Sequence, residues 1–431
     1  MHFSDYNSCI DYLFSLERVG IKYDLKNIKS LCKHLGNPQK KFKSVHIAGT
    51  NGKGTVASVL NSIFVEGGYK SGLYTSPHII DFRERILING KKIDEQYIID
   101  FTNSLITQIE KISPSFFEVT TAMAFKYFAD NKVEFAFIEA GLGGRLDSTN
   151  IIKPEISIIT SISIDHTEYL GDTIEKIAYE KGGIIAENVP VITGKIPEEA
   201  MKVLKTQANI SDAELINSDK YAKFHNRRVI KNGIAFSIDT KNLRYKNLEL
   251  PLNGNFQFLN IATAFSALDK LTESGKVNFK EDDVRKGLLN IKKNSGFFGR
   301  FDVIHNYPTV VIDVSHNAEG ISNLESNLSQ FVYDNLFIIF GMMKEKEQYK
   351  CIHQIEKLDG IIFFTKPDNK RAEEPEVLFS KAKHLERAFI TENVSAAKTA
   401  VFRKAKPGDL ILVTGSFYVV SDFLKIFNSQ L

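Results

Sequence analysis

The 431-residue sequence has little that would tie it to a membrane, a nucleic acid or an oxidising compartment. Its three cysteines are scattered and lack metal-ligand spacing, so we expect reduced thiols rather than a disulfide framework. No apolar run approaches the roughly eighteen residues of a membrane span, and the first twenty residues hold no signal-peptide core. The net charge of +3 gives no strong global field. We therefore predict a cytoplasmic protein, monomeric, with no nucleic-acid or membrane partner.

The chain has neither internal repeats nor low-complexity segments, and its length allows two or three domains. Apolar runs alternate with helical patterns from residue 44 to about 194, which predicts a mainly parallel sheet with helices on both faces. Expected strands lie at 72–75, 133–139, 156–162 and 189–193, and expected helices at 116–128 and 173–181. Residues 215–252 change to short charged alternations with a hairpin signal at Asn232-Gly233, and are interpreted as antiparallel additions to the first domain.

A short glycine-bearing linker, Asn294 to Gly299, precedes a second alternation of strands and helices. Its expected strands lie at 309–312, 336–340, 360–364, 388–391 and 409–414. The predicted fold is α/β with two domains. Residues 1–296 form an ATPase-like domain with a phosphate-binding loop, and residues 297–431 form a smaller Rossmann-like domain. Two such domains imply a cleft in which ligands meet.

The most informative segment is Ser44 to Ser58, a buried strand, a glycine-rich turn holding Lys53, and the start of a helix. Such a turn directs backbone N–H groups and the positive end of the helix dipole at one point, which suits a phosphate. Lys53 adds a cation, and the hydroxyl of Thr55 suits Mg²⁺. The match to the usual phosphate-loop pattern is imperfect, since Ile47 replaces a glycine and Gly54 separates Lys53 from Thr55. An ordinary strand-to-helix turn is the alternative.

Downstream polar residues follow other expected strands. Glu139, Asp147 and Asn150 offer oxygen donors of the kind that Mg²⁺ accepts, although a solvated turn would look the same. His166 follows the strand at 156–162, where α/β proteins bind ligands, and could equally be a hydrogen-bonding residue. Lys181 would by default be a solvated lysine at a helix end.

Taken together, the ordered motifs resemble those of folylpolyglutamate synthases, a family within the Mur ligase superfamily that includes bifunctional bacterial dihydrofolate synthases. The resemblance spans residues from about 10 to 425. The motifs are Gly49-Thr-Asn-Gly-Lys-Gly-Thr55, Tyr74-Thr-Ser-Pro-His78 with Glu84-Arg85, Phe117-Glu118, Glu139-Ala-Gly-Leu-Gly-Gly-Arg145, Asp165-His-Thr167, Glu180-Lys181, Gly254-Asn-Phe-Gln257 with Asn260, Gly299-Arg300, Asp313-Val-Ser-His-Asn317 and Thr414-Gly-Ser416.

The resemblance implies ATP and two Mg²⁺ ions as cofactors, and a catalytic role for Lys53, Lys181, Asp313 and His316. The ATP-binding set would be Gly49, Thr50, Asn51, Gly52, Lys53, Gly54, Thr55, Asn260, Arg300 and Asp313. The metal-binding set would be Thr55, Ser76, Glu139, His166 and Lys181, the last as a carbamate. Phe82, Arg85 and Ser416 would lie on the substrate side, with His316 near the glutamate.

The activity that follows is ATP-dependent addition of L-glutamate to folate and to dihydropteroate through an acyl phosphate, with release of ADP and phosphate. A carboxylate is a poor electrophile, so ATP must activate it before an amine can form an amide. Two alternatives remain. A cell-wall Mur ligase would need a uridine-nucleotide domain ahead of the loop, where only 48 residues precede Gly49. A catalytically inactive nucleotide-gated binding protein would not need Glu139, His166 and Lys181 together.

Overall fold

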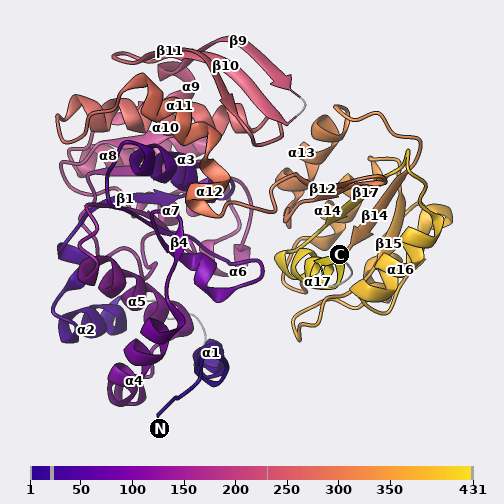
Figure 1. The fold of residues 1–431 in the computed structure, drawn as a ribbon, viewed down its shortest axis with the longest axis horizontal. Helices are drawn as coiled ribbons and strands as arrows, with labels where there is room; N and C mark the ends of the chain where they lie inside the picture. The colour runs from indigo at the N-terminus through magenta and orange to yellow at the C-terminus, as the bar shows by residue number, and fades with distance from the viewer. Residues whose placement is uncertain (1, 20–23, 231, 429–431) are drawn as a thin grey trace. The chain divides into compact units, whose positions relative to one another are not determined.

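The computed structural model describes residues 2–19, 24–230 and 232–428, and two compact units divide the chain (Figure 1). The first comprises Met1–Arg227, Ala235–Leu250 and Phe258–Phe297. The second comprises Arg228–Ile234, Pro251–Gln257 and Phe298–Leu431. The sequence did not indicate that two short segments before residue 260 would group with the second unit.

An eight-stranded sheet forms the centre of the first unit, in the order β4-β3-β2-β5-β1-β6-β7-β8. Its strands are β1 (Lys43–Ala48), β2 (Ser71–Tyr74), β3 (Ile86–Ile88), β4 (Lys91–Lys92), β5 (Phe135–Glu139), β6 (Ile156–Ile159), β7 (Val191–Thr193) and β8 (Leu215–Asn217). β1 pairs in parallel with both β5 and β6, while β3 and β4 add an antiparallel edge. The predicted mainly parallel sheet is confirmed.

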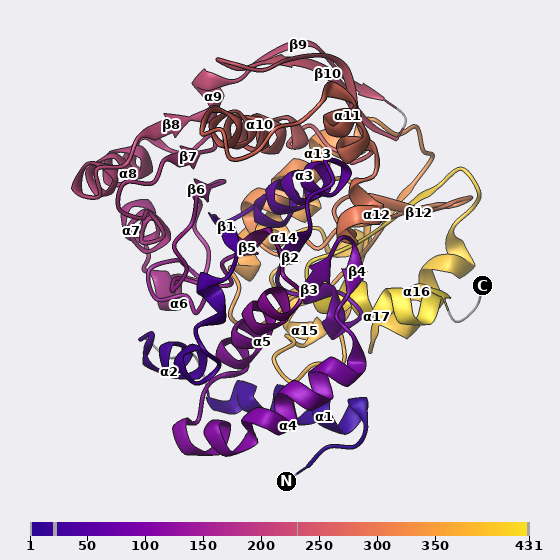
Figure 2. The ribbon, with the colours of Figure 1, turned by 60° about the vertical axis from the view of Figure 1, so that its left-hand side comes forward.

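Helices cover both faces of this sheet (Figure 2). They are α1 (Tyr6–Ser15), α2 (Lys26–His34), α3 (Lys53–Glu66), α4 (Glu95–Ile112), α5 (Phe116–Asp130), α6 (Thr167–Leu170), α7 (Ile174–Gly182), α8 (Glu198–Ile210), α9 (Ser218–Tyr221), α10 (Gln257–Glu273), α11 (Glu281–Leu289) and α12 (Ile291–Ser295), with 3-10 turns at Leu16–Val19, Pro38–Lys40 and Phe82–Arg85.

The alternation of side chains along β5 explains why two helical layers are needed. Phe135 and Phe137 both contact the ring of Phe64 in α3, with centroids 4.9 Å away. Ala136 and Ile138 point into the other core, which they share with buried residues of α4 and α5. Because successive side chains of a strand point to opposite faces, an apolar strand such as β5 requires cover on both.

A three-stranded sheet of consecutive strands follows, in the order β11-β10-β9. The strands are β9 (Lys223–Ile230), β10 (Gly233–Asp239) and β11 (Arg244–Leu250). Their connections are too short for a parallel crossover, which agrees with the hairpin expected at Asn232-Gly233. Lys231, in that turn, lies outside the described residues.

The second unit holds a six-stranded sheet in the order β12-β13-β17-β14-β15-β16, in which only the β12–β13 pair is antiparallel. Its strands are β12 (Asp302–Asn306), β13 (Thr309–Ile312), β14 (Leu336–Phe340), β15 (Ile361–Phe364), β16 (Ala388–Ile390) and β17 (Leu410–Thr414). Its helices are α13 (Ala318–Leu328), α14 (Gln348–Glu356), α15 (Pro375–Ser380), α16 (Val394–Lys404) and α17 (Phe417–Asn428), with a 3-10 turn at Leu385–Arg387. The α/β fold with two domains is therefore confirmed.

In the part of the chain that the structure describes, no helix combines the length and apolar character needed to cross a membrane.

One buried polar contact ties β1 to the segment ahead of β6. His46 is fully buried in β1, and its Nε2 lies 2.8 Å from the Thr149 hydroxyl. Its Nδ1 has no hydrogen-bond partner among the described residues. Burial lowers the pKa of His46 to about 3, because a charged imidazole would lose its hydration there. The imidazole is therefore neutral in the folded protein at ordinary pH.

This buried histidine makes a pH-dependent contribution to stability. The unfolded chain takes up the proton near pH 6.5 and the folded protein only near 3. The stabilisation is therefore complete above pH 6.5 and is lost as the pH falls. Between pH 7 and 5, we expect wild type to lose about 2 kcal/mol more unfolding free energy than His46→Gln, measured by chemical denaturation. Equal losses in the two proteins would contradict the neutral buried state.

Candidate active site

The predicted phosphate loop connects β1 to α3. Gly49 and Gly52 both have positive φ values, +150° and +86°, and Gly52 directly precedes Lys53, the first residue of α3. Neighbouring residues hold the loop. The amide of Thr50 donates to the Ser161 carbonyl at 2.9 Å, and the amide of Asn51 to the Ser161 hydroxyl at 2.8 Å. The amides at the start of α3 have no partner within the helix, so this turn is a suitable anion site.

Residues 160–162, in the segment that holds the loop, were predicted as part of a strand, but β6 ends at Ile159. The Thr160 hydroxyl donates to the Asn51 carbonyl at 2.6 Å, and the Thr50 hydroxyl donates to the Ser163 carbonyl at 3.2 Å. These polar contacts replace strand pairing, so the strand ends earlier than its apolar pattern indicated.

The ammonium of Lys53 lies inside the loop. It donates to the carbonyls of Gly49 at 3.1 Å and Thr50 at 3.2 Å, and it lies 3.8 Å from the Glu139 carboxylate. Thr55, two residues further along α3, is buried. The cation is therefore bound by the backbone carbonyls of the loop itself.

Glu139 is placed by the end of β5, the strand next to β1. Its carboxylate is buried and accepts the Ser76 amide at 3.3 Å, and a Cβ added to Gly54 would lie 3.6 Å from its Oε2. Glu139, Ser76 and Lys53 therefore come together. A buried carboxylate beside the hydroxyl-bearing residue Ser76 offers oxygen donors of the kind that Mg²⁺ accepts.

Lys181 is not the solvated helix-end lysine that its sequence context favoured. Its side chain is only 4% exposed, and its ammonium donates to the Gly49 carbonyl at 2.9 Å. The end of α7 therefore reaches the phosphate loop, and two ammonium groups, those of Lys53 and Lys181, share one carbonyl. Two amines thus lie at the loop, with the Glu139 carboxylate 3.8 Å from that of Lys53.

His166 precedes the short helix α6 and has a positive φ of 51°. Its amide donates to Asp165 Oδ1 at 2.9 Å, and its Nε2 lies 3.8 Å from Asp165 Oδ2. The side chain is 37% exposed, so the imidazole is accessible to a ligand.

Asp147 and Asn150 shape the loop after Glu139 instead of facing a metal. The carboxylate of Asp147 accepts the amides of Leu142 and Thr149, so both of its oxygens are used within the loop. The side-chain Nδ2 of Asn150 donates to the carbonyls of Arg145 and Gly183. In this structure Asp147 therefore holds its own loop, and Asn150 connects that loop to Gly183 at the end of α7.

Asn260, in α10, lies against the phosphate loop. A Cβ added to Gly52 would lie 2.3 Å from the Asn260 side-chain oxygen. The close approach explains why position 52 has no side chain, in addition to its positive φ. The predicted ATP-contacting residues of the first unit are thus grouped at one place.

Phe82 and Arg85 belong to an aromatic group at the start of β3. The ring of Phe82 contacts Phe14 in a T-shaped arrangement at 6.4 Å, and Arg85 lies over Phe116 at 5.2 Å. Arg85 also donates to His78 Nδ1 at 2.8 Å. Phe14, His78 and Phe116 were not identified as site residues from the sequence. Phe14 and Phe116, whose rings contact each other, are 102 positions apart in the sequence. No local sequence pattern reveals such a contact.

In the second unit, the predicted residues gather at the carboxyl ends of β13 and β17. The buried carboxylate of Asp313 accepts the amides of Phe301 at 2.9 Å and Ser315 at 2.8 Å. Burial raises its pKa, against the opposing effect of these hydrogen bonds. Asp313 thus holds two backbone segments. One is at Phe301, the residue after Arg300, and the other is at Ser315 in the loop after β13.

His316 and Ser416 lie at the same edge. Nδ1 of His316 lies 3.0 Å from the Val314 carbonyl, and the Ser416 hydroxyl accepts the Val419 amide at 3.2 Å. The Gly415 amide donates to the Ser315 carbonyl at 3.1 Å, which connects the segments carrying these two residues.

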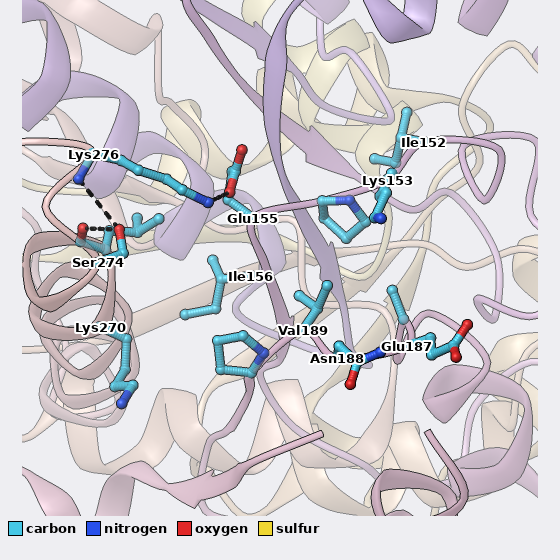
Figure 3. A pocket seen from close by; sticks show the side chains of 14 residues that line it. Ile152, Lys153, Glu155, Ile156, Glu187, Asn188, Val189, Lys270, Ser274 and Lys276 are labelled. Atoms are coloured by element: carbon cyan, nitrogen blue, oxygen red, sulfur yellow. Dashed lines mark hydrogen bonds and ion pairs between the residues drawn. The ribbon is translucent and has the colours of Figure 1, made fainter. Parts of the chain in front are cut away.

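A hollow of ≈ 740 Å³ in the first unit lies elsewhere (Figure 3). Its walls include the residues just before β6 and β7, at the amino ends of the parallel strands, whereas the phosphate loop follows the carboxyl end of β1. Two of its lysines are paired with glutamates, Lys276 with Glu155 and Lys270 with Glu214. We do not assign it to the candidate active site.

Family profiles match both parts of the chain. The Mur ligase middle domain matches residues 47–268, and the Mur ligase glutamate ligase domain matches residues 299–417. The chain is 32% identical to a Bacillus subtilis (strain 168) dihydrofolate synthase/folylpolyglutamate synthase, over 98% of this chain and 99% of the relative. The chain belongs to the folylpolyglutamate synthase family of Mur ligases.

Solved structures of the family have the same fold. A Mycobacterium tuberculosis folylpolyglutamate synthase complexed with ADP and AMPPCP matches with a TM-score of 0.88 and 30% identity, covering 98% of this chain and 99% of that one. A bifunctional folylpolyglutamate synthase/dihydrofolate synthase with Mn, AMPPNP and L-glutamate bound matches with a TM-score of 0.86 and 26% identity, covering 99% and 98%.

The contact between Gly52 and Asn260 leads to a mutational prediction. Gly52→Ala should weaken ADP binding by roughly tenfold or more, because the new methyl group displaces Asn260 and distorts the loop. Gly68→Ala is the matched control, since Gly68 has nearly the same φ, +82°, but nothing within 4 Å of an added Cβ. Both variants should lose similar stability from backbone strain, about 1–2 kcal/mol. The affinity for ADP is measured by calorimetric titration. Wild-type affinity in both variants would contradict the prediction.

Proposed function

We propose that this protein is an ATP-dependent ligase that adds L-glutamate to folates, and to dihydropteroate, with release of ADP and phosphate. The observation that carries the proposal is the loop at Gly49–Thr55, where the amines of Lys53 and Lys181 and the carboxylate of Glu139 converge. The relatives support it, since they are folate enzymes whose crystal structures hold nucleotides, a divalent metal and L-glutamate. They do not support a cell-wall ligase.

The reaction proceeds in two displacements. An oxygen of the pterin substrate's carboxylate attacks the γ-phosphorus of ATP, and the bond to ADP breaks to leave an acyl phosphate. The amine of glutamate then attacks the acyl carbon, loses a proton and expels phosphate, which leaves an amide. The first step brings two anionic groups together, so cations are required around them.

The chain's own residues fit these requirements. Lys53 and the amides at the start of α3 would hold the phosphate groups, with Asn260 beside the loop. Arg300 and Asp313 are proposed as further ATP-contacting residues, and His316 and Ser416 as residues on the glutamate side. Phe82 and Arg85, within an aromatic group, would bind the pterin substrate, because aromatic rings bind flat heterocycles by stacking.

A divalent cation would be held by Thr55, Ser76 and Glu139, and a second by Glu139, His166 and a carbamate on Lys181. The buried carboxylate of Glu139, beside the Ser76 amide, fits a hard cation. When bound, such cations offset the charge that develops on the phosphoryl oxygens. We further propose residues 1–296 and 297–431 as the ATP-binding and glutamate-ligase domains. The monomeric state and the cytoplasmic location stay predictions.

The activity can be tested with the pure full-length protein, ATP, Mg²⁺ and L-glutamate. Tetrahydrofolate and dihydropteroate are offered separately, and the products are read by mass spectrometry. ADP release should require both glutamate and a pterin carboxylate, with one glutamyl unit added for each ADP. Vigorous ATP hydrolysis that neither substrate affects would contradict ligation, and absence of turnover with intact ADP binding would favour an inactive binding protein.

The role of Lys181 can be tested by replacing its side chain. A carbamate supplies anionic oxygens, which are the ligands that Mg²⁺ prefers, so Lys181→Ala should lose activity by at least about a hundredfold. A short carboxylic acid in the buffer should restore part of it. Lys176→Ala is the control, because Lys176 lies on the same helix but is exposed and paired with Asp172. Full activity in Lys181→Ala would show that the buried amine is dispensable.

A further inference from the structure

One aromatic ring in the second unit contacts two of the proposed site residues. The guanidinium carbon of Arg300 lies 5.1 Å from the centroid of the Phe417 ring. The imidazole of His316 contacts the same ring, with centroids 5.8 Å apart and planes tilted by 49°. Phe417 is half-buried, so the ring is a side wall of the site and not part of the closed core.

The fold fixes the backbone that carries this ring. Phe417 is the first residue of α17, and only Gly415 and Ser416 separate it from the end of β17. β17 pairs in parallel with β13, so the segments that follow both strands lie at the same edge of the sheet. The Gly415 amide donates to the Ser315 carbonyl at 3.1 Å and connects these two segments. The backbone that carries the ring is therefore fixed at this edge of the sheet.

The backbone on both sides of Arg300 is also fixed, and the Phe417 ring is one of the groups that the Arg300 side chain contacts. The Gly299 amide donates to Asp302 Oδ2 at 2.6 Å, and the Phe301 amide donates to Asp313 Oδ2 at 2.9 Å. A long flexible side chain loses conformational freedom when it is held for a ligand. A surface that holds the guanidinium in advance reduces this cost when the ligand binds.

We infer that Phe417 is a positioning residue for the ligase reaction, and that its ring holds the Arg300 guanidinium in the orientation in which it meets an anionic ligand. The inference rests on the proposed function, in which Arg300 contacts ATP. Stacking on a ring face suits this task, because it uses none of the guanidinium's N–H donors. A carboxylate in the place of Phe417 would hold the side chain too, but it would neutralise the charge and use those donors.

The test compares Phe417→Leu with wild type in the full-length enzyme. Leucine keeps apolar bulk and removes the π face. We expect kcat/KM for ATP to fall about three- to tenfold, which is the range of a cation–π contact. Phe417→Tyr keeps the ring and should retain most of the activity. Phe389→Leu is the matched control, since Phe389 also lies under a cation, the Lys404 amine, on the edge strand β16.

A double-mutant cycle separates positioning from packing. If the ring acts through Arg300, Phe417→Leu should change ADP formation by less than about twofold when Arg300 is already alanine. Wild-type kinetics in Phe417→Leu would overturn the inference, and so would an equal loss in the Arg300→Ala background. If Phe417→Leu does not fold, Phe417→Met is judged by the same criteria. A wild-type enzyme that fails to ligate would instead overturn the proposed function itself.

Discussion

The phosphate loop depends on hydrogen bonds from the segment that follows β6. The amides of Thr50 and Asn51 are bound by Ser161, and the Asn51 carbonyl accepts the Thr160 hydroxyl. These contacts are possible because β1 and β6 are parallel neighbours, so their carboxyl ends emerge together. A turn with two glycines at positive φ would otherwise have many conformations. The sheet therefore fixes the shape of a loop that has little stability of its own.

The parallel sheet also brings together residues that are far apart in the chain. β5 places Glu139 beside the loop, and the segment after β2 places the Ser76 amide against that carboxylate. Lys181 arrives from α7 and reaches the same Gly49 carbonyl as Lys53. Each of these groups follows, or is held near, the carboxyl end of a strand, which is where ligands bind in open α/β sheets.

The parallel strands of the two large sheets could be predicted because they are largely apolar on both faces and bounded by turn residues. β13 and β14 were predicted with the residues that the structure gives them. The strand at 156–162 was predicted too long, because Thr160 and Ser161 are compatible with a strand but are used to hold the loop. The burial of Lys181 could not be predicted locally, since it depends on how α7 packs against β1 and its loop.

The site was harder to predict because a carboxylate has the same appearance in the sequence whether it binds a ligand or holds a loop. Asp147, in the first unit, and Asp313, in the second, are both buried, and burial raises the pKa of each. In both, the carboxylate oxygens accept hydrogen bonds from nearby backbone amides. These hydrogen bonds stabilise the charged form and fix the main chain around the neighbouring functional groups.

The two units therefore use one arrangement for different purposes. In each, a buried aspartate shapes the segment at the carboxyl end of a strand, and a different charged side chain is presented from that segment or beside it. In the first unit Asp147 holds the loop that follows Glu139, and in the second Asp313 and Asp302 hold the backbone on either side of Arg300. Separating the residue that fixes the backbone from the residue that meets the ligand keeps the latter's charge available. A residue that fixes the backbone and a residue that meets the ligand are distinguished only by their hydrogen-bond partners, and these partners are known only from the folded structure.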